Sequence, residues 1–165
     1  MSELDVDGEL IGNTELVESN RNILESINSC VLSSKKGIQK LDQALKKLLS
    51  TQKPELIIIE TSGSCHPLRL VEFFKNHGEV NLTGVFVLVD SLMLSHDFNY
   101  GENLIANMQQ NIIKGLRDTV NLLVEQIMFC SHLILTKGDR IEEGKLADVA
   151  SYVQEINPNV STHSV

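Results

Sequence analysis

Three short apolar runs constrain the fold of this chain more than any other feature. They cover Leu56–Ile59, Val85–Val89 and Leu133–Leu135, and none of them contains a polar residue. A strand that is apolar at every position is typical of a parallel sheet, which helices cover on both faces. Segments of helical length separate the runs, and this order implies right-handed strand–helix–strand crossovers. The sequence therefore predicts an α/β fold with parallel strands at about 56–60, 84–89 and 132–136.

The segments around these runs predict four helices. Leucines recur at helical spacing between about residues 34 and 49, with lysines on the other face. Pro67 suits the first turn of a helix that covers 68–76. A long helical stretch is expected at 103–129, and a last helix at 142–156, before Pro158. No internal repeat is visible, so residues 1–165 are predicted to form one domain.

Composition and charge exclude several classes of protein. Hydrophobic residues make up 42% of the chain, which suits a globular protein, and the net charge of −8 disfavours binding to nucleic acid. No apolar run approaches 18 residues, and the acidic start has no signal-peptide core, so no membrane association is expected. The three cysteines are too scattered for a disulfide framework. A cytoplasmic location is therefore expected.

Polar groups follow each run, where a parallel sheet binds its ligands. Glu60 follows the first run, Asp90 the second, and Thr136-Lys137-Gly138-Asp139 the third. The Asp139 carboxylate can accept from the two adjacent N–H groups of guanine, which adenine does not present. The Lys137 stem can lie along the plane of the base. Thr-Lys-x-Asp is also a common surface tetrapeptide, so this alternative stays open.

The segment after the first run has two interpretations. In the first, Gly63 lets the backbone approach a terminal phosphate, and Glu60 positions a water molecule or a Mg²⁺-bound water. In the second, the segment is an ordinary turn in which Ser62 or Ser64 caps a helix.

Five motifs in one order carry a family resemblance. They are Ile59-Glu60-Thr61-Ser62-Gly63 with Pro67, Gly84 to Ser91, Glu125-Gln126-Ile127, Leu135 to Asp139, and Ile156-Asn157-Pro158. In order and approximate spacing they resemble CobW-like GTPases of the CobW/HypB/UreG group, and Asp5–Leu10 is similar to the segment before that family's cysteine motif. The resemblance implies a P-loop NTPase-like sheet flanked by helices, GTP and Mg²⁺ as ligands, and a metallochaperone role in zinc homeostasis with a metalloprotein client.

The resemblance also implies roles for individual residues. It assigns nucleotide binding to Ser62, Gly63, Asp90, Thr136, Lys137 and Asp139, and a catalytic position to Glu60. It implies GTP hydrolysis as the family's activity.

The departures from the family pattern are as informative as the matches. No G-x-x-x-x-G-K-[ST] phosphate loop occurs in the sequence. The family's Gly-Cys-x-Cys-Cys metal motif corresponds to Ser29–Ser33, which keeps only Cys30. Cys65 and His66, together with Cys30, can in principle rebuild a Zn²⁺ site, because zinc takes mixed cysteine and histidine ligands. The expectation is a partial domain that lacks the first strand, the P-loop and the C-terminal domain.

Three hypotheses for function remain open. The first is a truncated CobW-type domain without independent GTPase activity. The second is half of a split GTPase, completed in trans by a chain that supplies the missing N-terminal segment. The third is a non-enzymatic interaction module that uses an exposed sheet edge.

Overall fold

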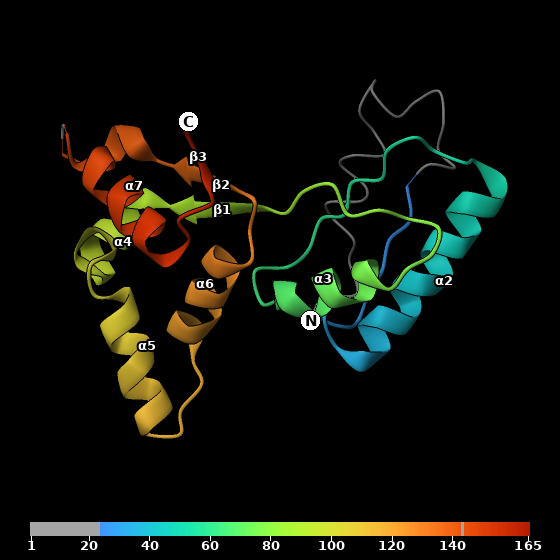
Figure 1. The fold of residues 1–165 in the computed structure, drawn as a ribbon, viewed down its shortest axis with the longest axis horizontal. Helices are drawn as coiled ribbons and strands as arrows, with labels where there is room; N and C mark the ends of the chain where they lie inside the picture. Colours follow the sequence, from blue (N-terminus) through green and yellow to red (C-terminus); the bar gives the residue numbers. More distant parts are fainter. Residues whose placement is uncertain (1–23, 143) are drawn as a thin grey trace. The chain divides into compact units, whose positions relative to one another are not determined.

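A computed structural model describes residues 24–142 and 144–165 and divides the chain into two compact units, Met1–Cys65 and His66–Val165 (Figure 1). The segment Asp5–Leu10, which carried part of the family resemblance, lies outside the described residues. The prediction that residues 1–165 form one domain stays a prediction.

The described part of the first unit is built around helix α2, Lys35–Thr51, close to the prediction of 34–49. Ser34 begins the helix, because its side chain accepts a hydrogen bond from the Gly37 N–H at 3.0 Å. A Cβ at Gly37 would lie 2.3 Å from the Val31 carbonyl oxygen, so only glycine fits there. The amphipathic pattern is confirmed by the buried leucines on one face, which are Leu41, Leu45 and Leu48.

The strand predicted at 56–60 is wrong. The chain has no strand there, and Leu56 and Ile58 expose 67% and 85% of their surface. An extended run becomes a strand only when its backbone N–H and C=O groups pair with a neighbour. Apolar content alone therefore misled the prediction at this segment.

The second unit contains a parallel three-stranded sheet in the order β1-β2-β3. Its strands are β1 Phe86–Asp90, β2 His132–Thr136 and β3 Ser161–Ser164. Phe86 pairs with His132, and Asp90 pairs with Thr136, so β1 and β2 end side by side. The parallel α/β sheet is confirmed, and two of the three predicted strands are present. The third strand of the sheet is β3, which the sequence did not predict because its residues are polar.

Helices precede the first strand and connect the three strands. They are α3 Pro67–Lys75, α4 Ser91–Asp97, α5 Leu104–Ile113, α6 Thr119–Met128 and α7 Lys145–Ile156, with short 3₁₀ turns η2 Asn99–Gly101 and η3 Gly138–Arg140. Pro67 does occupy the first turn of α3. Among the described residues, no helix is long and apolar enough to cross a membrane.

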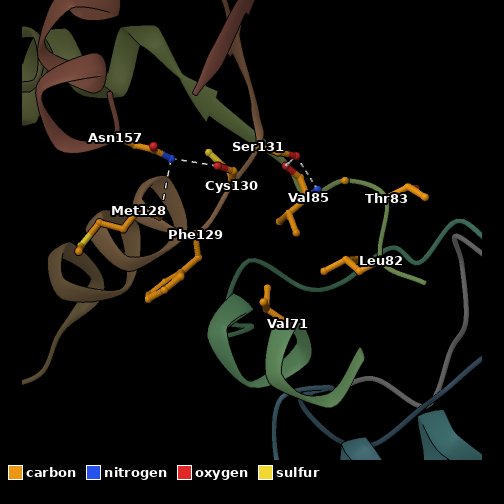
Figure 2. Close-up of a pocket in the computed structure, with 10 residues that line it drawn as sticks. Val71, Leu82, Thr83, Val85, Met128, Phe129, Cys130, Ser131 and Asn157 are labelled. Atoms are coloured by element: carbon orange, nitrogen blue, oxygen red, sulfur yellow. Dashed lines mark hydrogen bonds between the residues drawn. The ribbon is translucent and has the colours of Figure 1, made fainter. Parts of the chain in front are cut away.

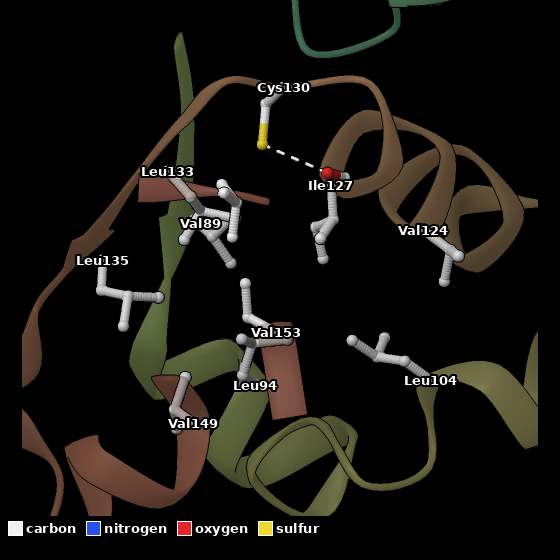
Figure 3. Close-up of a cluster of buried hydrophobic side chains, with 11 residues drawn as sticks. Val89, Leu94, Leu104, Val124, Ile127, Cys130, Leu133, Leu135, Val149 and Val153 are labelled. Atoms are coloured by element: carbon white, nitrogen blue, oxygen red, sulfur yellow. Dashed lines mark hydrogen bonds between the residues drawn. The ribbon is translucent and has the colours of Figure 1, made fainter. Parts of the chain in front are cut away.

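One core joins the helices to one face of the sheet. Figure 3 draws Val89 of β1 and Leu133 and Leu135 of β2 with the apolar side chains of α4, α6 and α7. All of these strand side chains expose 2% of their surface or less. Burial of these apolar side chains stabilises the second unit.

The single helix predicted at 103–129 is also wrong, because it divides into α5 and α6. Gly115, at φ +68°, takes the left-handed conformation that ends many helices. Asp118 then begins α6 in a capping box with Asn121. Both signals are visible in the sequence, and the apolar periodicity on either side obscured them.

The opposite face of the sheet is largely open. Phe86 and Leu88 of β1 expose 61% and 68% of their surface. The Phe86 ring stacks on His132, with 4.6 Å between ring centroids. Parallel sheets are usually covered on both faces. In this sheet, the described residues cover one face and leave the other face exposed.

Candidate functional site

The most distinctive cluster of polar residues lies where β1 and β2 end. Asp90 is the last residue of β1 and Thr136 the last of β2, and the two are paired in register. The Thr136 hydroxyl donates to the Val89 carbonyl oxygen at 3.3 Å, which ties the two strand ends together. The carboxyl ends of β1 and β2 therefore carry Asp90, Thr136, Lys137 and Asp139. Parallel sheets bind their ligands at this end of the strands.

Lys137 bends the chain immediately after β2. Its φ of 57° and ψ of 29° are left-handed, an uncommon conformation for a residue other than glycine. The bend turns the chain into η3, and the Lys137 ammonium forms an ion pair with Asp90. The ion pair and the capping bonds from Leu92 and Met93 lower the pKa of Asp90 below its ordinary value. Asp90 is therefore ionised at neutral pH.

Gly138 and Asp139 complete the loop. A Cβ at Gly138 would lie 3.1 Å from a methyl carbon of Leu146, so a side chain there would crowd α7. Asp139 is exposed and belongs to η3. An exposed carboxylate beside a tightly packed glycine is free to accept hydrogen bonds from a planar ligand.

Glu60, Ser62 and Gly63 belong to the other unit. They follow the apolar run that forms no strand, so Glu60 does not end a strand as predicted. The hydroxyls of Ser62 and Ser64 lie 3.0 Å apart, and the Cys65 N–H donates to the Ser62 carbonyl oxygen at 2.9 Å. A Cβ at Gly63 would meet no atom within 4 Å. The proximity of Glu60 to Asp139 stays a prediction.

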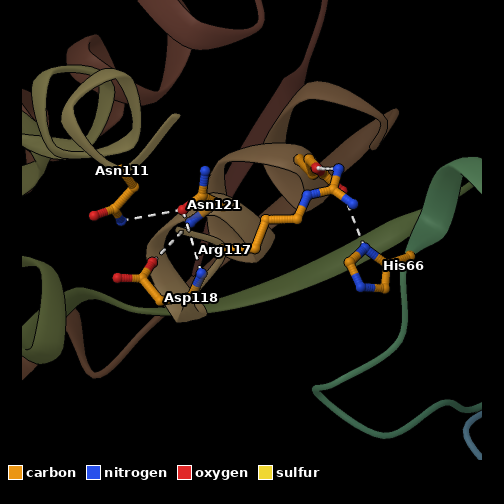
Figure 4. A network of polar contacts seen from close by, with 6 residues as sticks. His66, Asn111, Arg117, Asp118 and Asn121 are labelled. Carbon is orange, nitrogen blue, oxygen red and sulfur yellow. Dashed lines mark hydrogen bonds and ion pairs between the residues drawn. The ribbon is translucent and has the colours of Figure 1, made fainter. Parts of the chain in front are cut away.

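The three residues predicted as metal ligands have different environments. Cys30 is half-buried and Cys65 is buried. The His66 Nδ1 atom lies 3.0 Å from a Glu125 carboxylate oxygen, and the other oxygen accepts from Arg117 at 3.1 Å (Figure 4). Within residues 24–142 and 144–165, no three His, Cys, Asp or Glu side chains form a group that could hold a metal ion.

Arg117 was not predicted from the sequence, and Glu125 appeared there only inside a family motif. They lie 51 and 59 residues after His66 along the chain, and only the packing of α3 against α6 brings the three together. No local spacing rule could have found this network.

A hollow of about 350 Å³ opens at the other end of the sheet, where β1 and β2 begin (Figure 2). Val71, Leu82, Met128 and Phe129 give it an apolar lining, and Asn157 contributes a polar edge. Burial raises the pKa of the Cys130 thiol beside it, so that sulfur stays protonated at neutral pH. A lining of this kind does not suit a charged nucleotide or a metal ion.

Comparisons with known proteins identify the family to which the chain belongs. Residues 1–164 match the family model described as "CobW/HypB/UreG, nucleotide-binding domain". The chain is 26% identical over 189 aligned residues to "Zinc-regulated GTPase metalloprotein activator 1" of Dictyostelium discoideum. All of this chain is covered, but it spans only 39% of that protein's length. No solved structure matches the chain significantly.

Proposed function

This chain belongs to the CobW/HypB/UreG nucleotide-binding family, and from that premise we propose that it is a guanine-nucleotide-binding domain of the metallochaperone type. The observation that carries the proposal is the loop Thr136–Asp139. It follows β2 directly at the carboxyl edge of a parallel sheet, beside the end of β1. Ligands of open α/β sheets bind at this edge.

The residues of the loop suit a guanine base. The exposed Asp139 carboxylate accepts from the two adjacent N–H donors of guanine, and adenine lacks this pair of donors. Lys137 places a four-carbon stem at the same edge, against which the base plane packs. Gly138 lies against Leu146, so the backbone of the loop next to Asp139 stays close to α7.

Binding of the GTP phosphates by this chain has weaker support than binding of the base. The sequence contains no phosphate loop, although the open space above Gly63 would admit a phosphate close to the backbone. Glu60 and Ser62 are proposed to face the terminal phosphate and its water. Among the described residues no three His, Cys, Asp or Glu side chains form a metal-binding group, and we assign no step to Mg²⁺. These 165 residues alone should bind GTP in the millimolar range, which is about 4 kcal/mol.

Zinc and a client protein enter the proposal through the family. The relative in Dictyostelium is named as a zinc-regulated activator of metalloproteins, and a metalloprotein client is proposed for this chain as well. Cys30, Cys65 and His66 do not fit a resident zinc site, because they form no three-ligand group and His66 contacts Glu125. We therefore propose at most weak zinc binding, through Cys65 and His66. A cytoplasmic location stays a prediction.

The test is ligand-observed NMR with GTP, GDP and ATP. Guanine nucleotides should bind and ATP should bind more weakly. Asp139→Asn should lose about tenfold or more of the guanine affinity, because the charged acceptor is removed. Asp97→Asn, an exposed aspartate at the end of α4, is the matched control and should bind like the wild type.

Two results would overturn the proposal. One is equal binding of GTP and ATP by the wild type. The other is an Asp139→Asn variant that retains full guanine affinity. Micromolar GTP affinity or steady GTP turnover would instead contradict the weak binding expected of these residues alone.

One observation favours an alternative, in which a second chain completes the domain in trans. β1 is an edge strand among the described residues, and the exposed Phe86 and Leu88 lie on the open face beside that edge. A second chain could supply a strand that pairs with β1, a phosphate loop, and a layer that covers Phe86 and Leu88. Adding a P-loop-bearing segment of a family member should then raise GTP affinity at least about a hundredfold, and no change would exclude this alternative.

A further inference from the structure

The two carboxylate oxygens of Asp90 have different partners. One oxygen, Oδ1, accepts from the backbone N–H groups of Leu92 at 3.0 Å and Met93 at 3.1 Å. These bonds make Asp90 the N-cap of α4. The other oxygen, Oδ2, forms the ion pair with the Lys137 ammonium. A single side chain therefore links the start of α4 to the loop that follows β2.

The geometry of Lys137 makes this link unusual. The pair joins residues 47 positions apart, across the paired ends of β1 and β2. Lys137 holds a left-handed backbone conformation, which is unfavourable for a residue with a side chain. Such a conformation persists only where surrounding contacts hold it. The ion pair to Asp90 and the Arg140 N–H bond to the Lys137 carbonyl oxygen, at 3.1 Å, are contacts of that kind.

Both oxygens of Asp90 are thus engaged within the chain, which argues against a direct contact with nucleotide. We propose that Asp90 is a positioning residue for guanine recognition. Its carboxylate holds the Lys137 side chain, and with it the loop Thr136–Asp139, against the capped start of α4. This inference rests on the proposed function, and it replaces direct nucleotide binding as the role of Asp90.

The chain offers a matched control for this role. Asp118 caps α6 in the same way, since its Oδ1 accepts from the N–H groups of Val120 at 2.9 Å and Asn121 at 3.4 Å. No ion pair to Asp118 occurs within residues 24–142 and 144–165. Asparagine is as good an N-cap as aspartate. Asp90→Asn and Asp118→Asn therefore both keep a helix cap. Only Asp90→Asn removes the negative charge that pairs with a lysine.

The first experiment needs no nucleotide. Trace acetylation with acetic anhydride, quantified for each lysine by mass spectrometry, reports how freely each amine reacts. Lys137 should react about two- to fivefold faster in Asp90→Asn than in the wild type, the size expected of a partly exposed ion pair. It should be unchanged in Asp118→Asn, and the exposed Lys114 serves as the internal reference. An unchanged Lys137 in Asp90→Asn, or an equal increase in both variants, would overturn the inference.

The second experiment measures guanine-nucleotide affinity in a double-mutant cycle. Asp90→Asn should weaken GDP binding about two- to fivefold when Lys137 is present, and should have no effect in the Lys137→Met background. Tighter binding by Asp90→Asn, or an equal loss in both backgrounds, would contradict a positioning role. If the wild type binds no guanine nucleotide, the proposed function fails while the acetylation result still decides whether Asp90 holds Lys137. If GDP binds but acetylation is unchanged, only the present inference fails.

Discussion

Two segments of this chain look alike in sequence and differ in structure. Leu56–Ile59 and Val85–Val89 are both continuous apolar runs, and each ends at an acidic residue, Glu60 or Asp90. The second forms most of β1, whereas the first forms no strand. Ile58 exposes 85% of its surface, and Val89 exposes 2%. Strand-like composition is therefore not sufficient for a strand.

The difference lies in what each run pairs with. β1 pairs with β2 along its whole length, from Phe86 with His132 to Asp90 with Thr136. Helices α4 and α7 then cover the side chains on one face. The run at 56–59 has no paired backbone among the described residues, and its side chains are exposed or at most half-buried. Backbone pairing is the condition that separates the two runs, since even the exposed polar strand β3 forms where it pairs with β2.

The largest loss of unfolding free energy is expected from a substitution in the core beneath the paired strands. Leu133→Ala should destabilise the second unit by about 2–5 kcal/mol, because the side chain is fully buried and leaves a cavity. Urea unfolding followed by tyrosine fluorescence measures it, since Tyr100 and Tyr152 both belong to this unit. A loss below 1 kcal/mol would mean that the core is not packed as described.

Asn157 makes buried hydrogen bonds between the end of α7 and the segment that leads from α6 to β2. Its side-chain amide donates to the carbonyl oxygens of Ile127 and Cys130, each at 2.9 Å, in a buried position. Asn157→Ala should cost about 1–3 kcal/mol, because two buried carbonyl groups lose their donor. Asn76→Ala is the control, since the Asn76 amide makes one exposed bond, and its loss should be within about 0.5 kcal/mol. Equal losses in both variants would refute the assignment.

Asp90, the acid that ends the paired run, gives a pH-dependent prediction. Lys137 and the capping N–H groups lower its folded-state pKa below the ordinary aspartate value of about 3.9. Its charge therefore stabilises the fold above that value, and the contribution is lost as pH falls through the folded pKa. The wild type should exceed Asp90→Asn in unfolding free energy by about 1 kcal/mol or less at pH 6. Below about pH 4 the difference should shrink, and a difference that grows toward acid would contradict the sign.

The smallest effect is expected in the unpaired run. Ile58→Thr should change the free energy of unfolding by no more than about 0.5 kcal/mol, because the side chain is already in water. Thermal unfolding followed by circular dichroism is the measurement. A loss of unfolding free energy above 1 kcal/mol would contradict the contrast between the two runs, because it would mean that Ile58 is buried in solution.

Much of the candidate site could be predicted because it depends on short sequences. The apolar runs at Val85–Val89 and Leu133–Leu135 located β1 and β2, and the residues after them located the sheet edge with Asp90 and Thr136–Asp139. The positions of Glu60, Ser62 and Gly63 depend on a strand that does not form. Their part in the site stays a prediction for that reason.

The sequence by itself determined the elements whose signals are local. Leucine spacing determined α2, Pro67 the start of α3, and Asn157-Pro158 the end of α7, because each acts within one or two turns of chain.

Tertiary structure decided the features that need a distant partner. The polar strand β3 forms because its backbone pairs with β2, whereas Leu56–Ile59 pairs with no strand among the described residues. The pairs of Asp90 with Lys137 and of His66 with Glu125 join residues 47 and 59 positions apart. Local propensity carries no information at such separations, because burial and backbone pairing are properties of the folded chain as a whole.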